Sequence, residues 1–340
     1  MDKLRTTNIL LLVIVVPLVF YLLKILSFIF IPLVFSMFIA LLFLPIMRWL
    51  GKKKIPKSIG ILVVILLIAV GVKIGVELIQ ISSKEILNSD SDFFTKAETK
   101  INDLYILAQE TFGFEMDNKQ NVLNQFVQKD NIGGTIDFVR KTLTMILMTI
   151  FFVVLWLAES INIQKVLNST ILKQRHTSVK TFFKIEKDLI KFIKVKFFIS
   201  LATGIGTGLA CVFFDISFPI FWGLFAFIIN FVQMVGSIIT VVLLAIFAFV
   251  ELEPTSTLFF FILSITGVQV LFGTILEPIF MGKSFSLNVI TVLVMLMLWG
   301  FIWGVPGLIM AIPITVCIKI ILDQFPETKV LSNILSANKK

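Results

Sequence analysis

The chain has 340 residues, of which 58% are hydrophobic and 15% are charged, and its mean hydropathy is +1.01. This charged fraction is too low for an ordinary soluble domain, and the alternating segments of about ten residues that a membrane β-barrel requires are absent. The net charge of +9 does not indicate nucleic-acid binding, because the basic residues lie in loops between hydrophobic runs. We therefore predict an all-α, polytopic helical membrane protein with the lipid bilayer as partner.

Six hydrophobic runs are long enough to cross a bilayer, which takes roughly 17 to 25 residues. The predicted full spans are 6–23, 25–47, 58–81, 142–158, 197–214 and 255–276. The first run follows Lys3 and Arg5, as in a signal peptide, but no small-residue cleavage site follows, so we predict a retained anchor. Pro17, Pro32 and Pro45 are expected to kink or end helices.

Two further stretches, Ile216–Val250 and Ser284–Ile318, carry no charge for 35 residues each. One helix of that length would run about 50 Å through a core about 30 Å thick, whereas two spans and a turn need more residues. Polar residues or Gly and Pro interrupt both stretches near the middle, which is the sequence mark of a transporter's central site. We predict two interrupted or re-entrant hairpins, inserted from opposite faces; one long tilted helix in each stretch is the alternative.

The distribution of basic residues predicts the orientation of the chain in the membrane. Segment 48–57 holds five Lys or Arg and no acid, and segment 159–196 holds nine against three acids. Segment 82–141 instead holds seven basic and ten acidic residues. The positive-inside rule places the first two segments in the cytoplasm and the third outside, and alternation of the spans then makes both chain termini cytoplasmic.

These boundaries predict five parts. They are spans one to three (1–81), an extracellular helical insert (82–141), span four with a basic cytoplasmic helix (142–196), a transport core with both hairpins (197–322), and a cytoplasmic tail (323–340). Within the third part an apolar stripe surrounded by lysines predicts an amphipathic helix at the inner headgroups. The stripe consists of Phe182, Ile185, Leu189 and Phe192.

Catalytic and cofactor motifs are absent from the sequence. His176 is the only histidine, and Cys211 and Cys317 lie in hydrophobic runs, where packed thiols are expected. Glycines from Gly204 to Gly208 resemble a phosphate loop, but they lie inside a span and predict close helix packing instead. We predict no enzyme activity, no cofactor and no metal, and without an ATP site any pumping is driven by a gradient.

Polar groups at membrane depth are functional candidates because they are costly there. Lys73 and Glu77 are four residues apart and could pair on one helix face. Because they approach the outer end of span three, we expect their side chains to snorkel to the membrane surface instead. Asn230 and Gln233, in the middle of the first hairpin, either contact a polar solute or satisfy the broken backbone. Glu277 either binds a cation or proton or caps the end of the last full span.

The C-terminal half, 197–322, contains three runs that carry a family resemblance: Phe221–Ser237, Leu276–Lys283 and Leu298–Lys319. In order and spacing they resemble the bacterial autoinducer-2 (AI-2) exporter family, although Gln233 stands where that family has proline. The resemblance implies a homo-oligomeric transporter of the bacterial inner membrane, with pentamers expected. Some members are taken to export AI-2, a small polyhydroxylated solute, and others are similar to Na⁺(Li⁺)/H⁺ antiporters.

Because the mid-membrane polar groups are amides and not carboxylates, we favour efflux of a small polar solute, with AI-2-like signals as the expected cargo. The alternatives are an Na⁺/H⁺ antiporter and a membrane scaffold without transport. The predicted solute-binding residues are Asn230, Gln233, Gly236, Ser237, Gly304, Pro306, Gly307 and Pro313. The glycines are expected to permit unwound backbone. The ion-coupling candidates are Glu277, Asp215 and Glu251.

Overall fold

A computed structural model of the chain describes residues 2–88, 99–100, 132–166, 176–232, 235–252, 256–282, 287–325 and 328–336. In these ranges the chain forms helices joined by short turns, with an isolated bridge between Leu287 and Ser336. The all-α prediction is confirmed. Most of the predicted insert lies outside the described residues, as do Gln233 and Lys283.

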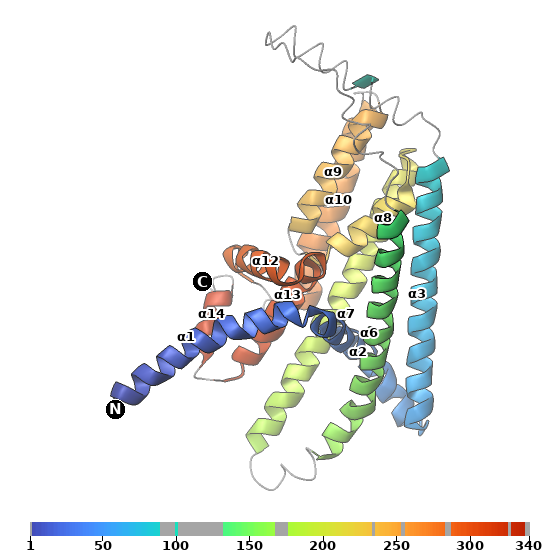
Figure 1. The fold of residues 1–340 in the computed structure, drawn as a ribbon. Coiled ribbons are helices and arrows are strands. Elements are labelled where there is room, and N and C mark those ends of the chain that lie inside the picture. Colours follow the sequence, from blue (N-terminus) through green and yellow to red (C-terminus); the bar gives the residue numbers. More distant parts are fainter. Residues whose placement is uncertain are drawn as a thin grey trace.

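The described part of the chain up to Phe213 contains five long helices. They are α1 (Asp2–Ile25), α2 (Ser27–Lys52), α3 (Lys57–Asn88), α6 (Ile132–Val166) and α7 (His176–Phe213). Helices α3, α6 and α7 run along the long axis of the molecule, and α1 projects to one side (Figure 1). Pro17, Pro32 and Pro45 lie inside α1 and α2 and end neither helix. The break between these helices falls at Leu26 instead.

Helix α7 corrects the prediction of a separate amphipathic helix at the inner headgroups. It is continuous from His176 to Phe213, so the predicted boundary at 196 falls inside it. Leu189 and Phe192 of the apolar stripe are buried in a core cluster with residues of α2 and α13 (Val305–Leu322). Ile185, Leu189 and Phe192 of the stripe therefore pack against protein, on the same helix that continues into the span.

Two short helix pairs interrupt the series of long helices. The first pair is α8 (Pro219–Ile229) and α9 (Val235–Glu251), and the second is α12 (Val289–Trp303) and α13. In Figure 1, α8 descends beside α7 and α9 returns to the same upper end, as predicted for a re-entrant hairpin. The alternative of one long helix in each stretch is therefore wrong.

The chain between the hairpins is a helix of changing pitch. It consists of α10 (Ser256–Gln269), the π-helix η2 (Val270–Leu276) and α11 (Glu277–Met281). After α13, the last helix α14 (Lys329–Leu335) belongs to the predicted tail. It is held at the base of the second hairpin, because Ser332 donates to the Asp323 carboxylate and the backbone N–H of Asn288 donates to the carbonyl of Leu335.

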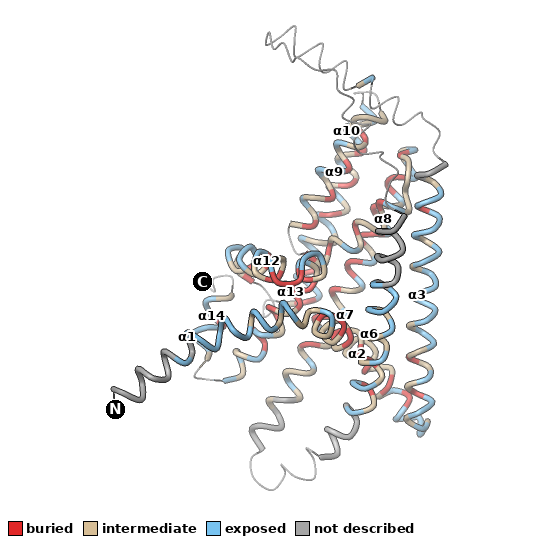
Figure 2. The backbone as a smooth tube through the Cα atoms, in the orientation of Figure 1, coloured by how far each residue is buried: buried red, intermediate tan, exposed pale blue. Residues whose placement is uncertain are grey.

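Five helices in the described part of the chain are long and apolar enough to cross a membrane. They are Ser27–Lys52, Lys57–Glu85, Phe183–Phe213, Ser256–Met281 and Val305–Leu322. Four of them match predicted spans, and the fifth is the second arm of the second hairpin. The predicted spans at 6–23 and 142–158 overlap the shorter apolar helices Val13–Ile25 and Leu143–Glu159. Figure 2 shows the described parts of α1 and α3 largely exposed, as expected for helices that face lipid. The multi-pass membrane architecture is confirmed.

Candidate functional site

Gly236 closes the first hairpin, and any larger residue at this position would force the two helices apart. A Cβ atom on Gly236 would lie 2.0 Å from the carbonyl oxygen of Ile229, the last residue of α8. The start of α9 therefore packs directly on the end of α8. Gly236 lies within regular helix, so the prediction that it permits unwound backbone is wrong: its role is close approach.

The second hairpin uses the same device. A Cβ atom on Gly307 would lie 1.9 Å from the carbonyl oxygen of Trp299 in α12. Here the break itself needs a glycine as well, because Gly304 has φ 62° and ψ −138°, a conformation that side chains strongly disfavour. Pro306 follows in the first turn of α13, where a proline ring fits without loss of a hydrogen bond. Pro313 lies buried inside α13.

Small residues bring the first hairpin onto α7. A Cβ atom on Gly204 would lie 2.7 Å from the carbonyl oxygen of Gly223 in α8, and one on Gly208 would lie 3.3 Å from the carbonyl oxygen of Pro219. These contacts confirm the prediction of close helix packing at these glycines, which is how polypeptide backbones approach each other in membranes.

A row of buried polar residues also runs along one side of α7. Its members recur at spacings of four, three and four residues, which places them on one side of the helix. They are Lys196, Ser200, Thr203 and Thr207, and all four residues are buried. We call this set the α7 polar face. This set is not among the predicted site residues, because Lys196 belongs to the basic segment that we expect in the cytoplasm. The signal that could have revealed it is the helical spacing of polar residues inside an apolar run.

Asn230, at the end of α8, faces this set. Its amide Nδ2 donates to the hydroxyl oxygen of Ser200 over 3.1 Å, and the residue is only 4% exposed. On the other side of the break, a Cβ atom on Gly273 in η2 would lie 3.3 Å from Oγ of Ser237. The break of the first hairpin therefore lies between the α7 polar face and the π-helix.

Glu277 completes the lower end of the same region. Lys196 Nζ lies 3.0 Å from both carboxylate oxygens of Glu277, and each side chain is 3% exposed. Lys196 lies about 25 Å along α7 from its end at Phe213, at 1.5 Å per residue. Glu277 is thus a buried ion-pair partner and not a cap exposed at a helix end.

The other two ion-coupling candidates lie at the opposite, upper end. The Glu251 carboxylate accepts from the backbone N–H of Ser217 at 3.2 and 3.0 Å and also from the Ser217 hydroxyl. This contact joins the two ends of the first hairpin. Asp215 lies in the turn before α8 and has φ 54°. The structure therefore separates Asp215 and Glu251 from Glu277.

Apolar residues of both hairpins belong to one core cluster. Val232 in the first break belongs to the same core cluster as Trp299 and Trp303 of α12. The polar contacts that gather Asn230 and Glu277 on α7 do not include Gly304, Pro306, Gly307 or Pro313. The structure thus brings together one part of the predicted site and leaves the second hairpin in the apolar core.

Two smaller predictions concern side chains outside this region. Lys73 and Glu77 form an ion pair at 3.7 Å on an exposed face of α3, which is the alternative to the favoured snorkelling. Cys211 and Cys317 are free thiols, one buried and one partly buried.

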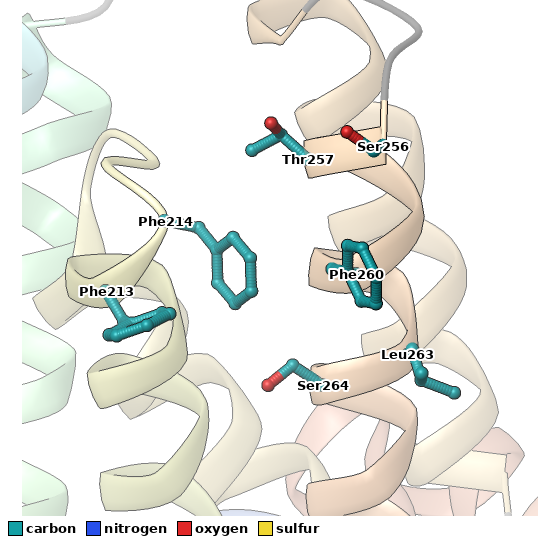
Figure 3. Close-up of a pocket in the computed structure, with 7 residues that line it drawn as sticks. All are labelled: Phe213, Phe214, Ser256, Thr257, Phe260, Leu263 and Ser264. Carbon is teal, nitrogen blue, oxygen red and sulfur yellow. The ribbon is translucent and has the colours of Figure 1, made fainter.

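An open pocket of about 510 Å³ lies between the upper ends of α7 and α10. Its lining residues are Phe213, Phe214, Ser256, Thr257, Phe260, Leu263 and Ser264. Figure 3 shows Phe214, Thr257 and Ser264 pointing into the space between the two helices, and Leu263 pointing away from it. The Phe214 ring packs on buried Phe261 at 5.5 Å. None of the predicted site residues lines this pocket.

Several bacterial proteins are similar to this chain. A putative transport protein of Haemophilus influenzae is 24% identical over 313 residues, which cover 88% of this chain and 87% of that protein. A putative transport protein of Borreliella burgdorferi is 32% identical over 157 residues, 46% of this chain and 43% of the relative. The AI-2 transport protein TqsA of Escherichia coli K12 is 30% identical over 148 residues, 43% of this chain and 42% of the relative.

The last two alignments each span less than half of the relative concerned. A family model is broader: the one described as AI-2E family transporter matches residues 9–327, almost the whole chain. The match includes both hairpins, the α7 polar face and the π-helix. This multi-pass membrane protein therefore belongs to the AI-2E transporter family.

Proposed function

We propose that this protein exports a small, polar, neutral solute of the AI-2 type along the α7 polar face, past the break of the first hairpin. The observation that carries the proposal is the buried hydrogen bond from Asn230 to Ser200. It places an amide at the end of a half-helix against a row of buried hydroxyl groups on α7. A solute hydroxyl can take the place of the Ser200 hydroxyl without leaving the amide unpaired.

The chemistry of this region favours a neutral cargo. Hydroxyl and amide groups recognise a polyol through hydrogen bonds, and the charges of Lys196 and Glu277 at the lower end of the α7 polar face neutralise each other. A net charge in a water-poor interior is costly. The description of the relative TqsA as an AI-2 transport protein supports the same class of solute, as does the resemblance of the hairpin sequences.

The direct test replaces Asn230 with leucine, alone and together with Gln233→Leu. We expect AI-2 flux in reconstituted vesicles to fall at least tenfold, because the amide that contacts the solute is lost, while assembly in the membrane is kept. Thr240→Val, at a buried hydroxyl of α9 that lies outside the α7 polar face and already bonds within its own helix, is the matched control and should retain most of the flux. A scaffold would tolerate all three changes, and unchanged flux in Asn230→Leu would overturn the proposed path.

The second candidate function is Na⁺(Li⁺)/H⁺ exchange at Glu277, with Asp215 and Glu251 as further ion-coupling candidates. Its supporting observation is that Glu277 is a buried carboxylate, which a cation could bind in place of the Lys196 ammonium group. AI-2 flux and Na⁺-dependent proton movement should be measured side by side in the same vesicles. Proton movement that is lost in Glu277→Gln, with no AI-2 flux in the unmodified protein, would establish the antiporter.

The resemblance also implies a homo-oligomer, with a pentamer as the expected form, in the bacterial inner membrane with both termini in the cytoplasm. Mass measurement of the detergent-solubilised protein tests the subunit number. Labelling of a cysteine placed at Leu252 tests the topology. Reaction from the outside only is expected, and reaction from the cytoplasm would contradict the proposed insertion of the first hairpin.

A further inference from the structure

Gln269, the last residue of α10, is a buried amide without a partner. The residue is 4% exposed, and neither its Oε1 nor its Nε2 makes a hydrogen bond within the described part of the chain. It follows Phe261 and Ile265 on the buried face of α10, at the spacing of one helical turn. Buried polar groups are almost always paired, so a fully unpaired amide indicates a missing partner.

The packing register places Gln269 in the same polar region as the first hairpin. A Cβ atom on Gly206 of α7 would lie 3.1 Å from Cγ1 of Val268, the residue before Gln269. On the α9 side, Gly273 approaches Ser237. Gln269 precedes Gly273 by four residues, so it lies further from the break and closer to the upper end of α7.

Hydroxyl groups are found at this level on both neighbouring helices. Thr203 and Thr207 belong to the α7 polar face, and Thr240 lies on α9; all three are fully buried. Thr203 donates to the carbonyl of Ile199 and Thr240 to the carbonyl of Gly236, within their own helices. The Thr207 hydroxyl has no partner among the described residues. Two side chains with unused hydrogen-bonding capacity thus lie on the facing helices α7 and α10.

We propose that Gln269 and Thr207 form a solute-binding site for a neutral molecule with vicinal hydroxyl groups. The amide offers an acceptor and a donor side by side, so Oε1 accepts from one hydroxyl while Nε2 donates to the next one. A solute with a single hydroxyl pairs only one of the two. Thr207 supplies a further donor or acceptor from α7.

The site is suited to an uncharged ligand. The hydroxyl groups at this level belong to threonines, and the ion pair of Lys196 and Glu277 lies at the lower end of the α7 polar face. This inference rests on the proposed transport function and adds to it a second group of contacts, on the far side of the break from Glu277. A solute would pass from the Asn230 contact to Gln269 on its way toward the upper end.

The test uses the full-length protein with Gln269→Met, which keeps the side-chain volume, and Thr207→Val, which keeps the shape. Thr240→Val is the matched control, because its hydroxyl already has a partner. AI-2 and the methyl furanosides of D-ribose and of 2-deoxy-D-ribose (called ribose and 2-deoxyribose below) are the probes, in vesicle flux and in ligand-induced thermal shift of the detergent-solubilised protein. The ribofuranoside has a vicinal pair of hydroxyls, at C2 and C3, that the 2-deoxyfuranoside lacks. The glycosides are locked as furanosides because the pyranose form of free 2-deoxyribose keeps a vicinal pair at C3 and C4.

We expect the unmodified protein to prefer ribose over 2-deoxyribose. Gln269→Met should raise KM for AI-2 and ribose at least tenfold, remove that preference and abolish the ribose-induced shift, while its own thermal stability stays equal or rises. Thr207→Val should have a smaller effect in the same direction, and Thr240→Val none. If Gln269→Met fails to assemble, Thr207→Val decides the question through the same readouts.

Unchanged KM and an unchanged ribose shift in both variants would overturn the inference and would assign the unpaired amide to bound water. That result would leave the proposed function intact, provided that Asn230→Leu still abolishes flux. If the unmodified protein moves none of the probes, the proposed transport fails. In that case the thermal shift alone tests the binding site. If none of the probes shifts the unfolding temperature of the unmodified protein, the proposed binding site is overturned as well.

Discussion

Gly236→Ala and Gly307→Ala should each prevent closure of a hairpin and abolish transport. A Cβ atom at these positions would lie 2.0 and 1.9 Å from backbone carbonyl oxygens of Ile229 and Trp299. A carbonyl inside a helix cannot rotate away as a side chain can, so the two arms must separate. Overpacking of this kind costs about 1–3 kcal/mol or more. Thermal unfolding in detergent and vesicle flux measure the result.

The chain provides a matched control for this prediction. Gly267→Ala in α10 places the same methyl group where no atom lies within 4 Å, and Gly71→Ala does so in α3. Both should unfold at the temperature of the unmodified protein or above it, since alanine favours helix over glycine by about 1 kcal/mol. If Gly307→Ala were as stable and active as Gly267→Ala, the close contact between Gly307 and the Trp299 carbonyl would be contradicted.

Loss of one partner of the Lys196–Glu277 pair should destabilise the protein more than loss of both. The two side chains are 3% exposed and their charged atoms are 3.0 Å apart, so Lys196→Met leaves a buried carboxylate without a counter-charge. Breaking such a pair costs about 3–5 kcal/mol, whereas apolar replacement of both partners is often close to neutral. We expect a large fall in unfolding temperature for Lys196→Met and a partial recovery for Lys196→Met with Glu277→Leu.

The pair of Arg48 and Glu186 is the comparison for this experiment. It joins α2 to α7 at 2.5 Å, but its side chains are 34% and 14% exposed. Water can solvate the partner that remains, so Arg48→Met should cost much less than Lys196→Met. Equal costs at both pairs, or a double variant at Lys196 and Glu277 that is no more stable than Lys196→Met, would show that the buried pair is not coupled in this way.

The hairpins could be predicted from the sequence because their length allows few alternatives. An uncharged run too long for one span and too short for two, broken in its middle at Asn230 or Gly304, leaves re-entry as the simplest solution. The role of Gly236 was predicted incorrectly. Glycine at a break permits unusual backbone angles, but it also permits contact with a neighbouring carbonyl, and only the structure shows which property is used.

The ion pair could not be predicted from local patterns. Lys196 stands at the end of a series of basic residues, and such a series is typical of a cytoplasmic face. Its partner, Glu277, is 81 residues away in the chain, so no helical spacing joins the two. The same holds for Gln269, whose lack of a partner depends on the packing of three helices. A resemblance in hairpin sequence does not contain this information.

The π-helix Val270–Leu276 separates Gln269 from Glu277. A π turn contains an additional residue, so the chain after it is rotated by about 100° relative to a regular α-helix. The direction in which the Glu277 carboxylate points is therefore set by the seven residues before it. Any movement that tightened this segment to ordinary pitch would turn the acid away from Lys196 and expose a different side of α11. Contact between Lys196 and Glu277 thus requires that this segment keep its π-helical pitch.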